Sequence, residues 1–209
     1  LGAFQDGWAK AVTTMVSQVP VAETPRRDHW VNVLPGCHLT PGDIEELREI
    51  IESFGLQPTF VPDVSGSLDG HMPDEWLGTT IGGTPLSALQ ELGGAAHTLA
   101  LGEQMRPAAQ ALQARCGVPF TVFDRLTGLT ATDAFIQHLA TLSGNEVPAR
   151  LRRQRSQLVD AMLDGHFHFG NVKVALAAEP DLLWAAGNFL TEMGAELAVA
   201  VTTTRSPLL

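Results

Sequence analysis

The side chains best suited to bind a metal or to take part in catalysis are Cys37 and His38, which are adjacent and follow an apolar run at residues 30–34. Such a run predicts a buried strand, and doubly wound α/β sheets hold their ligands at the carboxyl ends of strands. A thiolate and an imidazole are both common metal ligands. Adjacent residues on one turn seldom reach the same ion, however, and no further ligand stands nearby in the sequence. A structural role is therefore the favoured interpretation of this pair.

A second histidine pair, His166 and His168, flanks Phe167. In an extended segment the two imidazoles would share a face, where they could chelate zinc weakly. A turn that joins a helix to a strand is the favoured alternative.

An irregular stretch at residues 62–78 is longer than compact domains usually tolerate without a purpose, and we expect it to line a cleft. Its Asp69, His71, Asp74 and Glu75 are groups that can transfer protons. Acidic loops are usually only solvated, however, so this placement alone predicts no catalysis.

The glycine pair of T-T-I-G-G-T, at residues 79–84, could present backbone N–H groups to an anion at the start of the next helix. The spacing lacks the GxGxxG and GxxxxGK[ST] patterns, so a tight turn is favoured over nucleotide binding. GxSxG, HExxH and paired CxxC motifs are absent from the sequence as well. We therefore predict no catalytic, cofactor-binding or metal-binding residue, and keep Cys37, His38 and Cys116 as weak metal candidates.

Arginines crowd the start of a helix expected at residues 149–165, namely Arg150, Arg152, Arg153 and Arg155. Apolar residues that include Leu158 and Met162 recur there at helical spacing, which predicts one buried face. The arginines then form a solvated face, or alternatively contact an acidic partner or cofactor group.

Composition limits the class of protein. The net charge of −10 argues against binding to nucleic acid or to an anionic membrane surface. No apolar run approaches the roughly 20 residues of a membrane span, and no signal peptide is recognisable. Two distant cysteines suggest reduced thiols in a cytoplasm. Because the first residue is Leu1, we expect a fragment of a longer chain.

Short apolar runs alternate with amphipathic segments along the whole chain, which predicts an α/β fold of Rossmann-like parallel sheets flanked by helices. Strands are expected at residues 30–34, 57–61, 95–101, 119–123, 172–176 and 195–202, and helices at residues 6–19, 44–54, 103–116, 130–142, 149–165 and 181–193, with a further helix ending at Leu92. We divide the chain into a Rossmann-like domain at residues 1–125 and part of a second at 126–209.

Several segments, in order and with matching spacing, resemble nitrogenase component 1 proteins. They are V-N-V-L-P-G-C-H-L-T-P-G-D at residues 31–43, D-V-S-G-S-L-D-G-H at 63–71, T-T-I-G-G-T at 79–84, L-A-L-G-E-Q-M at 99–105, L-T-G-L-T-A-T-D at 126–133 and R-Q-R-S-Q-L-V-D-A-M-L-D-G-H at 153–166. H-L-T-P-G-D and S-G-S-L-D-G-H are more similar to the cofactor-assembly members of this family than to its nitrogenase β subunits.

The resemblance implies three Rossmann-like domains per subunit, of which this chain covers the middle one and part of the third. It also implies a scaffold that pairs with a related subunit in a heterotetramer, works with the nitrogenase iron protein, and matures a precursor of the iron-molybdenum cofactor. The family's cysteine ligands for the bridging iron-sulfur cluster lie in N-terminal segments that neither Cys37 nor Cys116 matches. We therefore expect no cofactor in this segment alone. A redox subunit of the same family, and an unrelated ligand-binding α/β module that uses residues 63–71, are the alternatives.

Overall fold

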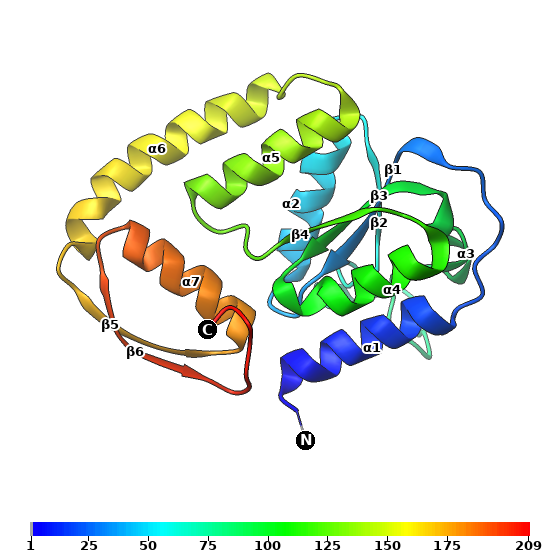
Figure 1. The fold of residues 1–209 in the computed structure, drawn as a ribbon, viewed down its shortest axis with the longest axis horizontal. Coiled ribbons are helices and arrows are strands. Elements are labelled where there is room, and N and C mark those ends of the chain that lie inside the picture. The colour runs from blue at the N-terminus through cyan, green and yellow to red at the C-terminus, as the bar shows by residue number, and fades with distance from the viewer. Residues whose placement is uncertain (1) are drawn as a thin grey trace.

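The computed structural model describes residues 2–209 and contains a four-stranded parallel sheet and a separate parallel strand pair (Figure 1). The larger sheet has the order β2-β1-β3-β4. Its strands are β1 (Arg27–Pro35), β2 (Gln57–Phe60), β3 (Ala95–Leu101) and β4 (Phe120–Phe123), and the pair consists of β5 (Lys173–Ala178) and β6 (Glu196–Thr202). The helices are α1 (Phe4–Gln18), α2 (Pro41–Glu52), α3 (Leu86–Gln90), α4 (Arg106–Cys116), α5 (Leu129–Ser143), α6 (Ala149–Phe169) and α7 (Pro180–Glu192), with 3-10 turns η1 (Leu92–Gly94) and η2 (Glu103–Met105). The predicted α/β class is confirmed.

The start of α2 shows how the sequence sets an element. Thr40 is the N-cap, and its hydroxyl accepts a hydrogen bond from the backbone N–H of Asp43 at 3.3 Å. The Asp43 carboxylate in turn accepts from the Thr40 backbone N–H at 2.7 Å. Pro41 fits the first turn because the N–H that it lacks would have no partner in the helix. This reciprocal cap starts α2 immediately after the loop that carries Cys37 and His38.

Successive residues of the central strands point to opposite faces of the larger sheet, as the geometry of a β-strand requires. Val33 and Leu99 belong to the core cluster that α2 and α5 cover, while Leu34 and Ala100 belong to the cluster that α1 and α4 cover. All four are fully buried. Figure 1 shows the two helical layers on either side of the sheet.

The C-terminal elements are more exposed than the sequence predicts. The run around β5 reads as a strand buried on both faces, but alternate residues of β5 are exposed, and every residue of β6 is exposed. Helix α7 packs against both strands and lies on one side of the pair (Figure 1). An apolar run shows only that a strand could be buried. Burial also requires elements that cover the strand, and among the described residues α7 covers one face of the β5–β6 pair.

Helix α6 also differs from the expectation. Leu151 is its only buried residue among those described, and Leu158, which we predicted to be buried, is 40% exposed. Met162 is half-buried. The helical spacing of apolar residues is correct, but α6 contacts the main core only at its first turn.

The boundary near residue 125 remains a prediction. Helix α5 follows that boundary, yet its Phe135 and Leu139 pack into the core of the larger sheet. None of the helices in residues 2–209 combines the length and apolar character needed to cross a bilayer.

Candidate functional site at the strand ends

The loop after β1 carries Cys37 and His38 to the carboxyl edge of the larger sheet, where the sequence placed them. Two residues that the sequence analysis did not treat as site candidates lie beside them. Gln104 follows β3 in the turn η2, and Asp181 lies in the first turn of α7. In the sequence, Asp181 is only an acidic residue at the start of the helix expected at residues 181–193, and no motif marks Gln104. Three segments that are far apart in the chain therefore build this edge.

Asp181 is the most buried acidic side chain described, with 0% of its surface exposed. Its carboxylate accepts hydrogen bonds from Gln5 Nε2 at 3.2 Å and from the Gln104 backbone N–H at 3.0 Å. Its own backbone N–H donates to Gln5 Oε1 at 3.0 Å. Burial raises the pKa of the Asp181 carboxyl, and the hydrogen bond from Gln104 opposes this rise. Asp181 thus connects α1, η2 and α7.

Glycines leave the space that this arrangement needs. A Cβ atom on Gly102 would lie 2.6 Å from Asp181 Oδ2, and the φ of Gly102 is +106°. A Cβ on Gly36 would lie 2.6 Å from the Leu101 carbonyl oxygen and 2.8 Å from His38 Cε1. Both distances are shorter than any ordinary contact, so only glycine fits where His38 and Asp181 approach the strand ends.

The environment favours neutral forms of Cys37 and His38. Burial raises the pKa of the Cys37 thiol; the neighbouring Gln104 opposes this, while the carboxylates of Glu179 and Asp181 add to it. Burial lowers the pKa of His38, against the opposite influence of Asp181 and Asp43. A protonated thiol is a weak nucleophile and a weak metal ligand. The pair therefore does not have the charge state of an activated catalytic dyad.

Unpartnered polar atoms remain at this edge. His38 Nδ1 and both side-chain amide atoms of Gln104 are buried without a hydrogen-bond partner in the described structure. A hollow of about 170 Å³ adjoins His38, Gly102 and Arg125. Because buried polar atoms normally have partners, His38 Nδ1 and the likewise unpartnered Arg125 Nε, whose side chains line this hollow, are the groups most able to hydrogen-bond a small polar ligand there.

These residues do not by themselves fit a resident iron-sulfur cluster. Within residues 2–209, no three side chains of His, Cys, Asp or Glu converge as a metal site would require. Cys116 ends α4, apart from the loop that carries Cys37. One protonated thiol next to one neutral imidazole is too small a ligand set for a cluster that binds through several thiolates.

The two interpretations of His166 and His168 are both wrong, because α6 continues through Phe169 and includes them. Residues two apart on an α-helix point about 200° apart, so the two imidazoles cannot share one ion. His166 Nδ1 instead lies 3.2 Å from the Met193 carbonyl oxygen.

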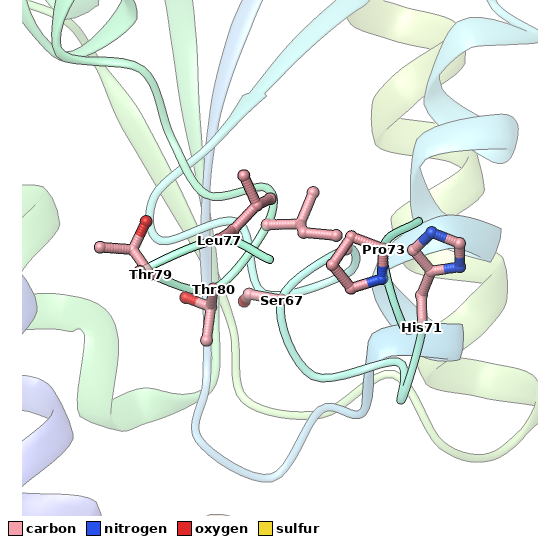
Figure 2. A pocket seen from close by; sticks show the side chains of 9 residues that line it. Ser67, His71, Pro73, Leu77, Thr79 and Thr80 are labelled. Atoms are coloured by element: carbon pink, nitrogen blue, oxygen red, sulfur yellow. The ribbon is translucent and has the colours of Figure 1, made fainter. Parts of the chain in front are cut away.

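The long irregular stretch lines a hollow, as expected. The hollow has a volume of about 350 Å³. Figure 2 shows side chains that line it and labels Ser67, His71, Pro73, Leu77, Thr79 and Thr80. Asp69, Asp74 and Glu75 are exposed on the same loop. Helix α3, which follows the glycine pair, has only five residues, so the aligned peptide dipoles of an anion site are not available.

The arginines of α6 lie on the surface. Arg155 makes two hydrogen bonds of 2.7 Å with the Asp133 carboxylate, and Arg150 pairs with Glu46 and Glu49 of α2. This arrangement agrees with a solvated face whose charges are partly paired.

The parallel sheet with helices on both faces defines an α/β protein of the doubly wound class. The chain belongs to the nitrogenase component 1 type oxidoreductase family, whose sequence profile matches residues 1–209. Among curated relatives, the nitrogenase iron-molybdenum cofactor biosynthesis protein NifN of Bradyrhizobium diazoefficiens is 54% identical over 211 aligned residues, which cover 100% of this chain and 45% of the relative. NifN of Nostoc sp. is 52% identical, with 100% and 47% covered. The chain thus spans less than half the length of these relatives.

A solved structure described as nitrogenase Cp1 at pH 6.5 superimposes with a TM-score of 0.92 at 32% identity. The superposition covers 100% of this chain and 45% of the chain of the solved structure. The sequence-based family assignment and fold class are therefore both confirmed.

Proposed function

We propose that this chain is part of a scaffold subunit of the NifN type, which pairs with a NifE-like subunit in a heterotetramer. On this scaffold a precursor of the iron-molybdenum cofactor is matured as cargo before delivery to nitrogenase. The observation that carries the proposal is the 54% identity to a NifN protein across the whole chain, compared with 32% to the solved nitrogenase structure.

The strand-end site supports a scaffold more than a turnover enzyme. Cys37 and His38 are held in neutral forms, and Asp181 is engaged in three hydrogen bonds that join separate segments. A scaffold requires such fixed geometry and does not require a nucleophile with an adjacent base. This segment offers too few ligand side chains for an iron-sulfur cluster. In the complete assembly, such clusters would therefore be bound by residues outside this segment, or by those residues together with residues of this segment.

The second candidate is a redox subunit of nitrogenase component 1 type. The family description as oxidoreductase and the likeness to a solved nitrogenase favour it. The nitrogenase iron protein is a proposed partner under both functions. For either, we propose a cytoplasmic location with no nucleic-acid or membrane partner, in agreement with the net charge of −10.

The two functions can be separated with the complete protein. Co-expression with a NifE-like subunit, followed by purification without oxygen, should give a stable complex that carries iron and sulfide. Added to an assembly extract that lacks only this complex, it should restore activity to cofactor-free nitrogenase. A complete protein that remains monomeric beside the NifE-like subunit contradicts the scaffold. Substrate reduction by the complex itself, with electrons from the iron protein, indicates the redox subunit.

A further inference from the structure

The loop between β2 and α3, residues 61–85, presents large apolar side chains to solvent. Trp76 is 90% exposed and Met72 is 84% exposed, and Leu68 and Leu77 are also exposed. Single exposed apolar residues are common on protein surfaces, but several on one loop, with a tryptophan among them, mark a contact surface. Tryptophan in particular is enriched among the residues that dominate binding energy.

The base of this loop is fixed, so its tip is held in place. The Thr84 hydroxyl donates to the Phe60 carbonyl oxygen at 2.6 Å and accepts from the Asp63 backbone N–H at 2.9 Å. Asp63 also pairs with Arg48 of α2. Gly82 packs against the backbone of Gly66, where a Cβ would lie 3.2 Å from the nearest atom. A loop closed at its base loses less conformational entropy on binding than a free segment does.

The charge of the loop indicates what it binds. Residues 61–85 contain four carboxylates, Asp63, Asp69, Asp74 and Glu75, and neither lysine nor arginine. Arg48 neutralises Asp63, which leaves the other three on the exposed tip. Such a tip repels nucleic acid, an anionic membrane and a second copy of this chain, whose net charge is −10.

We propose that the tip at residues 68–77 is a docking element for another protein, whose surface has an apolar pocket for Trp76 within a rim of lysine or arginine. The indole provides the buried anchor, and the surrounding carboxylates orient the partner and accelerate encounter. This docking role follows from the chemistry of the loop and does not depend on the scaffold function.

The test uses the full-length protein in its natural assembly, with the photoreactive amino acid benzoylphenylalanine at position 76 as the probe. The matched control carries the same group at position 167, because Phe167 on α6 is an aromatic side chain that is 79% exposed. After irradiation, the cross-linked residues are mapped by mass spectrometry. We expect position 76 to cross-link to a single segment of one other protein, and that segment to be rich in lysine and arginine. Position 167 should not cross-link to this segment.

Two further measurements make the expectation specific. The cross-link yield at position 76 should fall about fivefold or more between about 0.05 M and about 0.5 M KCl, and similarly in an Asp74→Asn, Glu75→Gln background. Binding of the identified partner should weaken about 30-fold in Trp76→Ala. Absence of a cross-link, a cross-link within the same chain or to another copy, or a salt-insensitive link to an acidic surface would each overturn the proposal.

Discussion

Gln5 and Asp181 exchange two hydrogen bonds across 176 positions of sequence: Gln5 Nε2 donates to Asp181 Oδ1, and the Asp181 backbone N–H donates to Gln5 Oε1. Both residues are buried. This contact fastens α7, and with it the strand pair β5–β6, to the first helix. It also completes the edge where Cys37 and His38 lie.

Removal of the Asp181 carboxylate should therefore destabilise the protein measurably. Asp181→Ala leaves the Gln104 backbone N–H and the Gln5 amide without acceptors, and each orphaned buried donor costs about 1–3 kcal/mol. We expect a fall of that order in the free energy of unfolding, measured by urea titration. The control Asp160→Ala, on the exposed part of α6, should stay within about 0.5 kcal/mol of the parent. Equal effects of the two changes would contradict the role given to Asp181.

Gly102 and Gly117 allow a matched test of the space at the site. Both have a positive φ, +106° and +70°, so alanine introduces backbone strain of about 1 kcal/mol or more at each. Only at Gly102 does the new Cβ also meet Asp181 Oδ2, whereas Gly117 has nothing within 4 Å. Gly102→Ala should lower the thermal midpoint clearly more than Gly117→Ala. Equal shifts would mean that Asp181 moves aside freely.

A partly buried histidine pair makes stability depend on pH. His97 and His138 have ring centroids 5.1 Å apart, and His97 Nε2 lies 2.9 Å from Thr121 Oγ1. Burial, followed by the charges of His138 and Arg26, lowers the pKa of His97 to about 4, from 6.5. Between these values the unfolded chain binds the additional proton, so stability falls as the pH drops from about 6.5 to about 4.

This difference of about 2.5 units in pKa sets an upper limit of about 3 kcal/mol on the loss of stability, and solvent screening of the partly buried ring reduces it. Urea titrations at several pH values should show this slope in the parent chain and a weaker slope in His97→Gln, where His38 and His138, whose pKa values burial also lowers, account for the remainder. His71→Gln removes an exposed imidazole and serves as the control, with the parent slope expected. An unchanged slope in His97→Gln would place the pH dependence elsewhere.

Leu139 on α5 and Leu158 on α6 allow a matched comparison between a core position and a surface position. Leu139 of α5 is fully buried in the main core, so Leu139→Ala should cost about 2–5 kcal/mol. Leu158 of α6 is 40% exposed, so Leu158→Ala should cost less than about 1 kcal/mol. Chemical denaturation of both variants checks the difference. A cost at Leu158 as large as that at Leu139 would show that another layer covers α6.

The surface arginines should contribute little to stability. Arg152→Ala combined with Arg153→Ala removes two exposed charges and one hydrogen bond, from Arg152 Nη1 to the Val147 carbonyl oxygen at 2.7 Å, which is worth about 0.5–1.5 kcal/mol. The midpoint of thermal unfolding should change by only a few degrees. Loss of the folded state in this double variant would contradict the assignment of a solvated face.

The sequence predicted the larger sheet well because its signals are local. The strand at Ala95–Leu101, for example, has the bounds expected from its run of apolar residues alone. Burial of α6 and β6 was not predictable in this way, since it depends on which layers cover them. The contacts among Gln5, Gln104 and Asp181 could not be predicted either, because these residue types are common and the three residues are far apart in the sequence.

The proposed scaffold function requires that the complete complex matures cofactor and does not itself turn over substrate. The most direct measurement is substrate reduction by cofactor-free nitrogenase after incubation with the purified full-length complex in an assembly extract that lacks it. We expect activity only when the complex, the extract and cofactor-free nitrogenase are combined, and none from the complex with the iron protein alone. Substrate reduction by the complex and iron protein alone would contradict the scaffold function.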